Sequence, residues 1–265
     1  MYRSLISLMP KATGFDPDAQ AFITAAAITD NTQKNAINTL VLDLKSNGIW
    51  TKMKAIYPIV GGTASQHKFN LKDPRDLDAA FRLTFATGWT HSATGMTPLN
   101  TFANTFFNSN SFGLLNSHHI SYYSRSNVNL TQVEIGNASG TSANNLNARF
   151  TNVSYFRINA TISGTLGYIS AADTDSRAFY IGNRTASNVV NGWRNSVKIT
   201  SGTLASVGLP NNNIYIGAFN NGGTATNNTT KQCAFASIGD GLTDTDAANF
   251  YTAVQAFQTS LGRQV

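Results

Sequence analysis

The chain has 265 residues, of which 42% are hydrophobic and 12% are charged, and its formal net charge at pH 7 is +6. This length suits one large β domain with a small appendage. Charged residues usually make up about 25% of a soluble domain, so Asn, Thr and Ser must cover much of this surface. Such an exterior is typical of extracellular or virion β proteins and unlike that of a cytosolic metabolic enzyme.

The positive charge does not indicate a nucleic-acid partner, because the basic residues are scattered along the chain and form no block. We also expect no membrane partner, since no apolar run is long enough to cross a bilayer. The apolar stretch within residues 1–10 is too short for a secretory signal. The single cysteine, Cys233, excludes an intramolecular disulfide and is expected to be a buried thiol within a strand.

Helical spacing extends over residues 16–57. Asp16 and Pro17 predict a capped helix start, and a second helix carries apolar residues at helical spacing over 36–44. Asn47-Gly48 is the expected end of that helix. We predict a third short helical piece over 49–56, so that residues 1–62 form a helical collar.

Beyond residue 62, short strands separated by turn residues replace the helical pattern and predict two packed antiparallel sheets. Two regions without a clear period, 87–115 and 139–146, are predicted to be loops. The predicted strands cover residues 79–85, 120–125, 132–136, 147–150, 154–160, 177–183, 187–193, 196–200, 213–219 and 231–239.

Turn chemistry places two further features. The pairs Asn191-Gly192 and Asn195-Ser196 both favour a hairpin tip, and we choose Asn195-Ser196 because Trp193 then pairs with Val197 or Lys198. A final helix begins near residue 243, where Thr243 or Asp244 can accept the free amide hydrogens of the first turn.

Segments 177–196, 214–217 and 236–239, followed by the terminal helix, resemble a concanavalin A-like (laminin G-type) lectin or glucanase jelly roll. The resemblance covers about residues 77–256. It implies a mostly β fold, an antiparallel jelly-roll sandwich over residues 63–265 that follows the N-terminal helical collar and ends in a C-terminal helix.

Segments 18–23, 48–58, 70–76 and 253–258 resemble virion proteins of tailed, crAss-like phages of Bacteroidetes hosts. This resemblance implies a structural protein of the particle: a head-fibre, capsid-decoration or tail-fibre component. Such a protein is made in the host cytoplasm, resides in the virion, and has other virion proteins and copies of itself as partners.

Glucanases of the jelly-roll architecture place two carboxylates on alternate residues of one strand, where they act as acid and nucleophile. Glu134 is the only glutamate of the predicted β region, and no second carboxylate lies two or four residues away. We therefore expect no catalytic residues and no enzyme. The alternative is a polysaccharide depolymerase, a glycosidase or a lyase, on the same fold.

Carbohydrate binding to a host surface glycan is the expected function of the sandwich. On a strand, His119, Ser121, Tyr123 and Arg125 share one face and form a candidate glycan-contact row, although aromatic residues in strands often only pack. The Asn- and Thr-rich regions 87–110 and 220–228 are further candidates. The predicted carbohydrate-binding residues are Trp89, His119, Tyr123, Arg125, Asn220 and Asn221.

No cofactor or metal site is predicted. Asp173 and Asp175 offer two carboxylates that calcium could use, but a solvated turn before the next strand is the favoured interpretation. His67 and His91 lack partners at metal-ligand spacing.

The helical collar contains more apolar residues than a short peripheral hairpin needs for itself. We expect these residues to pack both on the sandwich and against neighbouring subunits, so that the collar is an assembly segment. The predicted assembly residues are Phe22, Ile23, Trp50 and Met53.

Overall fold

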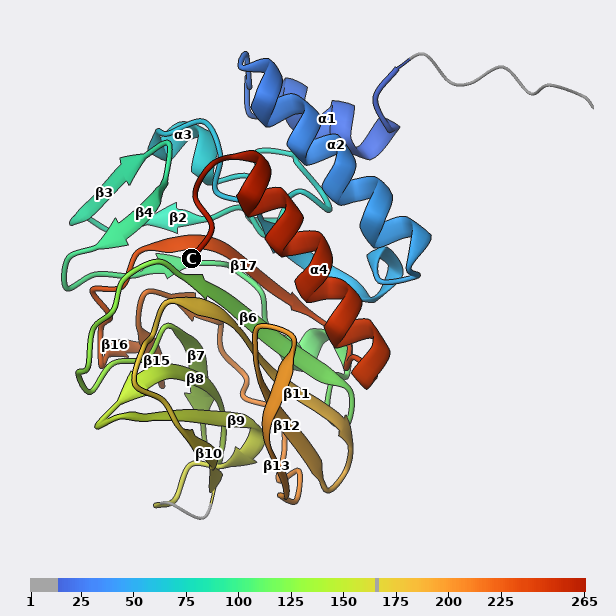
Figure 1. The fold of residues 1–265 in the computed structure, drawn as a ribbon. Coiled ribbons are helices and arrows are strands. Elements are labelled where there is room, and N and C mark those ends of the chain that lie inside the picture. Colours follow the sequence, from blue (N-terminus) through green and yellow to red (C-terminus); the bar gives the residue numbers. More distant parts are fainter. Residues whose placement is uncertain (1–13, 165–166) are drawn as a thin grey trace, which may run out of the picture.

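The computed structural model describes residues 14–164 and 167–265. Within them, two β-sheets pack face to face, and helices α1, α2 and α4 cover the outer side of one sheet (Figure 1). This arrangement confirms the predicted β-sandwich with N-terminal helices and a C-terminal helix. Among the described residues, no helix is both long and apolar enough to cross a bilayer.

The sheet beneath the helices has eight strands in the described residues, and we call it the helix-side sheet. Its order is β13-β12-β11-β6-β17-β4-β3, with β1 also paired to β17. The strands are β1 (Met53–Tyr57), β3 (Trp89–Ser92), β4 (Gly95–Pro98), β6 (His118–Ser124), β11 (Ala178–Ala186), β12 (Val189–Arg194), β13 (Val197–Thr203) and β17 (Cys233–Gly239).

The second sheet has nine strands in the described residues, and we call it the pocket-side sheet. Its order is β10-β9-β8-β7-β14-β5-β2, and β15 adds to β7 as a parallel neighbour while pairing with β16. The strands are β2 (Thr84–Phe85), β5 (Ala103–Asn104), β7 (Ile135–Ser139), β8 (Ser142–Phe150), β9 (Val153–Thr161), β10 (Ile169–Ala172), β14 (Tyr215–Ile216), β15 (Phe219–Asn221) and β16 (Thr224–Thr226).

Local capping defines the helices. In α1 (Pro17–Ala25) the Asp16 side chain accepts a hydrogen bond from the Asp18 amide, and α2 (Asn31–Ser46) ends before Gly48, whose φ is 68°. In α4 (Asp244–Ser260), Thr243 and Asp246 form a reciprocal capping box. The predicted helix ends at Pro17, Asn47-Gly48 and Thr243 are confirmed. A short helix, α3 (Ala64–His67), and three 3₁₀ turns complete the helical structure of the described residues.

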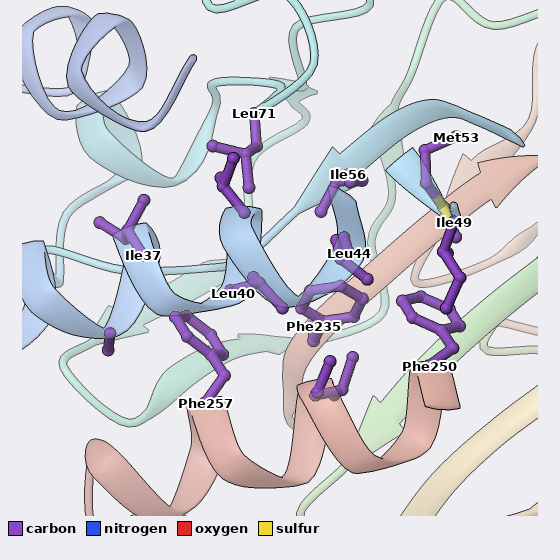
Figure 2. Close-up of a cluster of buried hydrophobic side chains, with 14 of the residues drawn as sticks. Ile37, Leu40, Leu44, Ile49, Met53, Ile56, Leu71, Phe235, Phe250 and Phe257 are labelled. Atoms are coloured by element: carbon purple, nitrogen blue, oxygen red, sulfur yellow. The ribbon is translucent and has the colours of Figure 1, made fainter. Parts of the chain in front are cut away.

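Two apolar cores result. Between the sheets, Ile120 and Tyr122 of β6 and Tyr180 of β11 meet Leu146 and Phe156 of the opposite sheet. Between the helices and the helix-side sheet, a second core joins α2, α4 and β17. Figure 2 shows its centre, where Leu40 and Leu44 of α2 face Phe257 and Phe250 of α4, and Phe235 of β17 lies between the two helices.

The predicted assembly residues lie in this second core. Phe22, Ile23, Trp50 and Met53 are 1%, 4%, 9% and 2% exposed, and they pack against side chains of their own chain. Almost none of their surface is exposed, so these residues pack within the chain, and their contact with neighbouring subunits stays a prediction.

His119, Ser121 and Tyr123 share one face of β6, as predicted, but helices cover that face. The His119 ring packs edge-on to Phe250 of α4, and its nitrogens bond to the Asp240 carbonyl at 2.6 Å and to the Ser237 hydroxyl at 3.0 Å. The Tyr123 hydroxyl donates to Gln255 of α4 at 2.9 Å. Burial lowers the pKa of His119 to about 4, so the ring is neutral at pH 7. The predicted glycan-contact row is therefore wrong in its premise that this face is exposed.

Several sequence-based assignments are corrected where a distant partner strand decides the structure. Residues 49–56, predicted as helical, contain only the 3₁₀ turn Trp50–Lys52 before β1, which pairs antiparallel with β17. The predicted loop 87–115 contains β3, β4 and β5, and the predicted loop 139–146 contains the start of β8. The predicted domain boundary at residue 62 remains a prediction, although β1 before it belongs to the sandwich.

The predicted hairpin tip is confirmed. Arg194 pairs with Val197 and Trp193 pairs with Lys198, which leaves Asn195-Ser196 at the turn. Gly192 lies within β12 instead. Glycine is favoured there because any side chain would place its Cβ 2.3 Å from the Phe156 ring of the opposite sheet. Cys233 is fully buried in β17, as predicted, and burial raises the pKa of its thiol to about 12.

Candidate functional site

A pocket of about 340 Å³ lies on the outer face of the pocket-side sheet, away from the helices. Its floor comes from β8 and β9, and its walls come from β15, β16 and the segments that precede β7, β10 and β17 or follow β9. The lining residues are Thr131, Val133, Asn145, Asn147, Phe150, Tyr155, Arg157, Ile162, Tyr168, Phe219, Asn221, Thr226 and Asn227.

Strand alternation and register build the floor. Asn145 and Asn147 are alternate residues of β8, and Tyr155 and Arg157 are alternate residues of β9, while the residues between them enter the inter-sheet core. Asn145 pairs with Arg157 and Asn147 pairs with Tyr155 across the two strands. Four polar or amphipathic side chains therefore lie next to one another on the outer face.

The floor continues toward β15. Gly136 of β7 pairs with Asn145 on one side and with Phe219 of β15 on the other. A Cβ at Gly136 would lie 2.4 Å from the Asn144 carbonyl oxygen and 2.9 Å from the Asn145 Cβ, so this position favours glycine.

Aromatic rings form the walls. The Tyr155 ring lies 5.8 Å from the Phe150 ring and 5.6 Å from the Tyr168 ring, measured between centroids. The guanidinium of Arg157 stacks on Tyr168, 3.7 Å from the ring centroid. The four aromatic residues of the lining, Tyr155 on the floor and Phe150, Tyr168 and Phe219 around it, are half-buried and present part of their surface to solvent.

The asparagine pair leaves one acceptor unused. Asn145 Nδ2 donates to Asn147 Oδ1 at 2.7 Å, and Asn147 Nδ2 donates in turn to the Gln132 carbonyl. Within residues 14–164 and 167–265, the Asn145 Oδ1 atom has no hydrogen-bond partner, although the residue is only 1% exposed. An unsatisfied buried acceptor costs about 1–3 kcal/mol, so this oxygen indicates a site where a ligand can donate a hydrogen bond.

A buried ion pair supports one wall of the pocket. Lys231 Nζ lies 2.8 Å from Glu134 Oε1, and both side chains are fully buried. Glu134 also accepts hydrogen bonds from the Ala148 amide at 2.6 Å and from the Thr229 hydroxyl at 3.0 Å. Lys231 donates to Gln132 Oε1 at 3.3 Å as well. The pair thus fixes segments 131–133 and 226–229, both of which contribute lining residues.

Among the described lining residues there is no aspartate, glutamate or histidine, so the pocket does not provide the two carboxylates of a retaining or inverting glycosidase. Its polar groups are amides, hydroxyls and one guanidinium.

Of the predicted carbohydrate-binding residues, Asn221 is the one that lines this pocket. Asn220, next to it, is 2% exposed and shapes the turn, since its Nδ2 donates to the Asn213 carbonyl at 2.7 Å and its Oδ1 accepts from the Gly223 amide at 2.8 Å. His119 and Tyr123 lie on the helix-covered face of the other sheet.

Trp89 and Arg125 are also outside the pocket. Trp89 lies in β3, where its Nε1 donates to the Phe102 carbonyl at 3.0 Å. Arg125 follows β6 and binds the Arg263 carbonyl at 2.8 Å and Gln232 Oε1 at 2.7 Å. The structure does not bring the six predicted residues together, since Asn221 lines the pocket and the other five do not.

The carboxylates considered for calcium have protein partners. Asp173 Oδ2 accepts from the Ser154 and Tyr180 hydroxyls, each at 2.6 Å, and Asp175 pairs with Arg177 at 2.7 Å. Across residues 14–164 and 167–265, no three ligating side chains gather into a metal site.

His67 at the end of α3 and His91 of β3 lie side by side, which their spacing in the sequence did not indicate. The Nδ1 atoms of His67 and His91 lie 2.9 Å apart, and burial lowers the pKa of His67 to about 3. Burial also lowers the pKa of His91, so both rings are neutral at pH 7 and one Nδ1 donates to the other.

Comparisons with known proteins show the fold. No family model matches the chain, and no curated protein matches it in sequence. A mutant of the Trypanosoma rangeli sialidase that displays trans-sialidase activity is similar with a TM-score of 0.51 and 7% identity, over 84% of this chain and 39% of that chain.

Two further structures show weaker likeness. Domain 4 of AbnA, a GH43 extracellular arabinanase from Geobacillus stearothermophilus solved with arabinotriose, has a TM-score of 0.47 and 12% identity over 75% of this chain and 98% of that chain. The receptor-binding domain of botulinum neurotoxin mosaic serotype C/D has a TM-score of 0.48 and 11% identity, over 77% of this chain and 51% of that chain. At 7% identity the likeness to the sialidase shows the fold alone, a two-sheet β-sandwich.

Replacing Glu134 by glutamine tests the support of the pocket wall. The change leaves Lys231 as a buried cation without a counter-ion, and we expect it to lower the free energy of unfolding by about 3–5 kcal/mol. Urea denaturation at pH 7 measures the loss. The matched control is Asp78→Asn, which breaks an ion pair with Arg82 whose side chains are 52% and 31% exposed. Because exposed ion pairs contribute little, the control should leave the denaturation midpoint almost unchanged. Equal losses in the two variants would contradict this account.

Proposed function

We propose that this chain is a non-enzymatic, glycan-binding protein and that the pocket on the pocket-side sheet is its binding site. The observation that carries the proposal is the floor, where Asn145 presents a buried acceptor without a partner among aromatic walls. Pockets with apolar walls and a few convergent polar groups are the usual sites for small ligands.

Sugars fit this combination for a physical reason. A pyranose ring has one apolar face of C–H groups, which packs on aromatic rings, and a rim of hydroxyls, which need both donors and acceptors. Tyr155 and Tyr168 offer the rings, and Asn145 and Asn221 offer amide groups. The pocket volume of about 340 Å³ suits one or two sugar residues at a chain end or in a branch.

The composition of the pocket supports binding over cleavage. A polysaccharide depolymerase would need an acid and a base or nucleophile within reach of the scissile bond. The described lining residues supply hydroxyls, amides and a guanidinium instead. The depolymerase remains the alternative function, and it is distinguished by its products.

A glycan array followed by titration calorimetry tests the proposal. We expect the chain to bind at least one host-type glycan, and Tyr155→Ala to weaken binding about tenfold or more, because truncating a central aromatic anchor usually costs over 1 kcal/mol. The control is Tyr251→Ala, a half-buried tyrosine of α4 that packs on the helix core outside the pocket. We expect the control to bind as the unmodified chain does.

Two results would contradict the proposal. If no glycan binds, or if Tyr251→Ala weakens binding as much as Tyr155→Ala, the pocket is not the glycan site. If incubation with the bound polysaccharide releases reducing ends or unsaturated sugars, the depolymerase is the correct function.

We also propose that the chain is a structural component of a phage virion, in a head fibre, capsid decoration or tail fibre. The support for this role is the resemblance of segments 18–23, 48–58, 70–76 and 253–258 to virion proteins of crAss-like phages. In that setting a glycan-binding sandwich would contact the host surface while other virion proteins hold the chain. Mass spectrometry of purified particles should detect the chain at stoichiometric level, and its absence from particles would refute this role.

A further inference from the structure

Three arginines are almost completely buried: Arg157, Arg184 and Arg263, at 2%, 0% and 1% exposure. None of them is within salt-bridge distance of a carboxylate in the part of the chain that the structure describes. A buried guanidinium is unfavourable unless hydrogen bonds or an anion replace the water that it has lost. The three residues differ in how this requirement is met.

Arg184 and Arg263 each make several short hydrogen bonds to protein acceptors, although Nη2 of Arg184 has no partner among the described residues. Arg184 donates four hydrogen bonds of 2.8–3.1 Å to main-chain carbonyls. Arg263 donates five hydrogen bonds of 2.6–3.3 Å, four to main-chain carbonyls and one to a side-chain oxygen. Both therefore act as internal clamps. The acceptors are the carbonyls of Ile158, Ala186, Ser187 and Leu204 for Arg184, and those of Pro58, Ile59, Ala93 and Ala234 with Gln258 Oε1 for Arg263.

Arg157 has much weaker protein partners. Its Nε donates to the Gly167 carbonyl at 3.4 Å and its Nη2 to the Gly164 carbonyl at 3.2 Å, both at the long end of the range for hydrogen bonds. Its Nη1 makes no hydrogen bond to a described residue. Unlike the other two arginines, Arg157 lines the pocket, and its strand neighbour Asn145 carries the unused acceptor.

The geometry points to an acidic sugar as the ligand of the pocket: we propose that Arg157 binds the carboxylate of a uronic-acid or sialic-acid residue. This inference rests on the proposed glycan-binding function and adds the class of sugar. The planar guanidinium matches a carboxylate in a paired arrangement, and stacking on Tyr168 holds it in one orientation. A hydroxyl of the same sugar would donate to Asn145 Oδ1.

The charge of the pocket supports this assignment. Arg157 is the only charged side chain among the described lining residues, so a ligand with one negative charge neutralises the site. Burial lowers the pKa of Arg157 because it disfavours the charged form, and a bound anion would offset that cost. A sulfated sugar presents similar chemistry and is included in the test.

Binding to matched glycans tests the inference. The full chain is titrated calorimetrically with a uronic-acid polysaccharide, with the same polysaccharide after chemical reduction of its carboxyl groups to hydroxymethyl groups, and with a neutral polysaccharide bearing sulfate esters. A sialylated oligosaccharide and its reduced form make a second pair. We expect the chain to prefer the carboxylated member of at least one pair about tenfold or more, since hydrogen bonds to charged groups contribute more than those to neutral ones.

Two variants locate the preference. Arg157→Gln keeps a side chain of similar reach without the charge, and it should bind the carboxylated and reduced glycans alike. Arg149→Gln is the control, because Arg149 is a nearby arginine of β8 that binds Asn127 and Asn152 outside the pocket, and it should keep the preference. Arg157→Lys, which keeps the charge but loses the planar fork, should retain only part of it. If Arg157→Gln does not fold, the comparison of paired glycans on the unmodified chain still decides.

The possible failures are distinguishable. If the chain binds carboxylated and reduced glycans equally, the acidic-sugar inference is wrong while the proposed glycan-binding function stands. If it prefers the sulfated polysaccharide to both, the anion is a sulfate and the carboxylate assignment is overturned. If no glycan of either kind binds, the proposed function fails and the inference fails with it.

Discussion

The buried ion pair between Glu134 and Lys231 is the interaction on which the pocket depends. Glu134 lies just before β7, and Lys231 lies just before β17. The pair is hydrogen-bonded to the Ala148 amide of β8 and to the side chains of Gln132 and Thr229 in the neighbouring segments. Each of these connections fixes backbone that carries pocket residues. Because a buried charge without its partner is strongly destabilising, the pair allows very little variation in this geometry. The pocket is therefore preformed, which limits the ordering that a ligand must cause.

The helices give the two sheets different roles. Helices α1, α2 and α4 cover the outer face of the helix-side sheet and convert it into the middle layer of the molecule. His119 and Tyr123, which alternate on that face, become internal hydrogen-bonding groups. The outer face of the pocket-side sheet instead carries Asn145, Asn147, Tyr155 and Arg157. In a simple two-layer sandwich the polar residues of this face would only contact solvent. Here they line the pocket.

Sequence reasoning was accurate where local chemistry decides the structure. The caps at Asp16 and Thr243, the helix end at Gly48 and the Asn195-Ser196 turn all follow from side chains within a few residues of one another. It failed for β3, β4 and β5, because strands of two to four residues carry too little alternation and are stabilised by partners far along the chain. The pocket was missed for a related reason. Residues 154–160 were predicted as a strand, but residues 139–146 were predicted as a loop, and the register that sets Asn145 beside Arg157 depends on a bulge between β8 and β9.

The central claim is that ligands bind to the pocket-side sheet and not to the face beneath the helices. Two-dimensional ¹H–¹⁵N NMR of the full chain during titration with a bound glycan tests it most directly, since side-chain amides report from both places. The account predicts that the Asn145 and Asn147 side-chain amide signals shift, while those of Gln255 and Gln258 of α4 do not. Shifts confined to Gln255 and Gln258, with Asn145 and Asn147 unchanged, would contradict it.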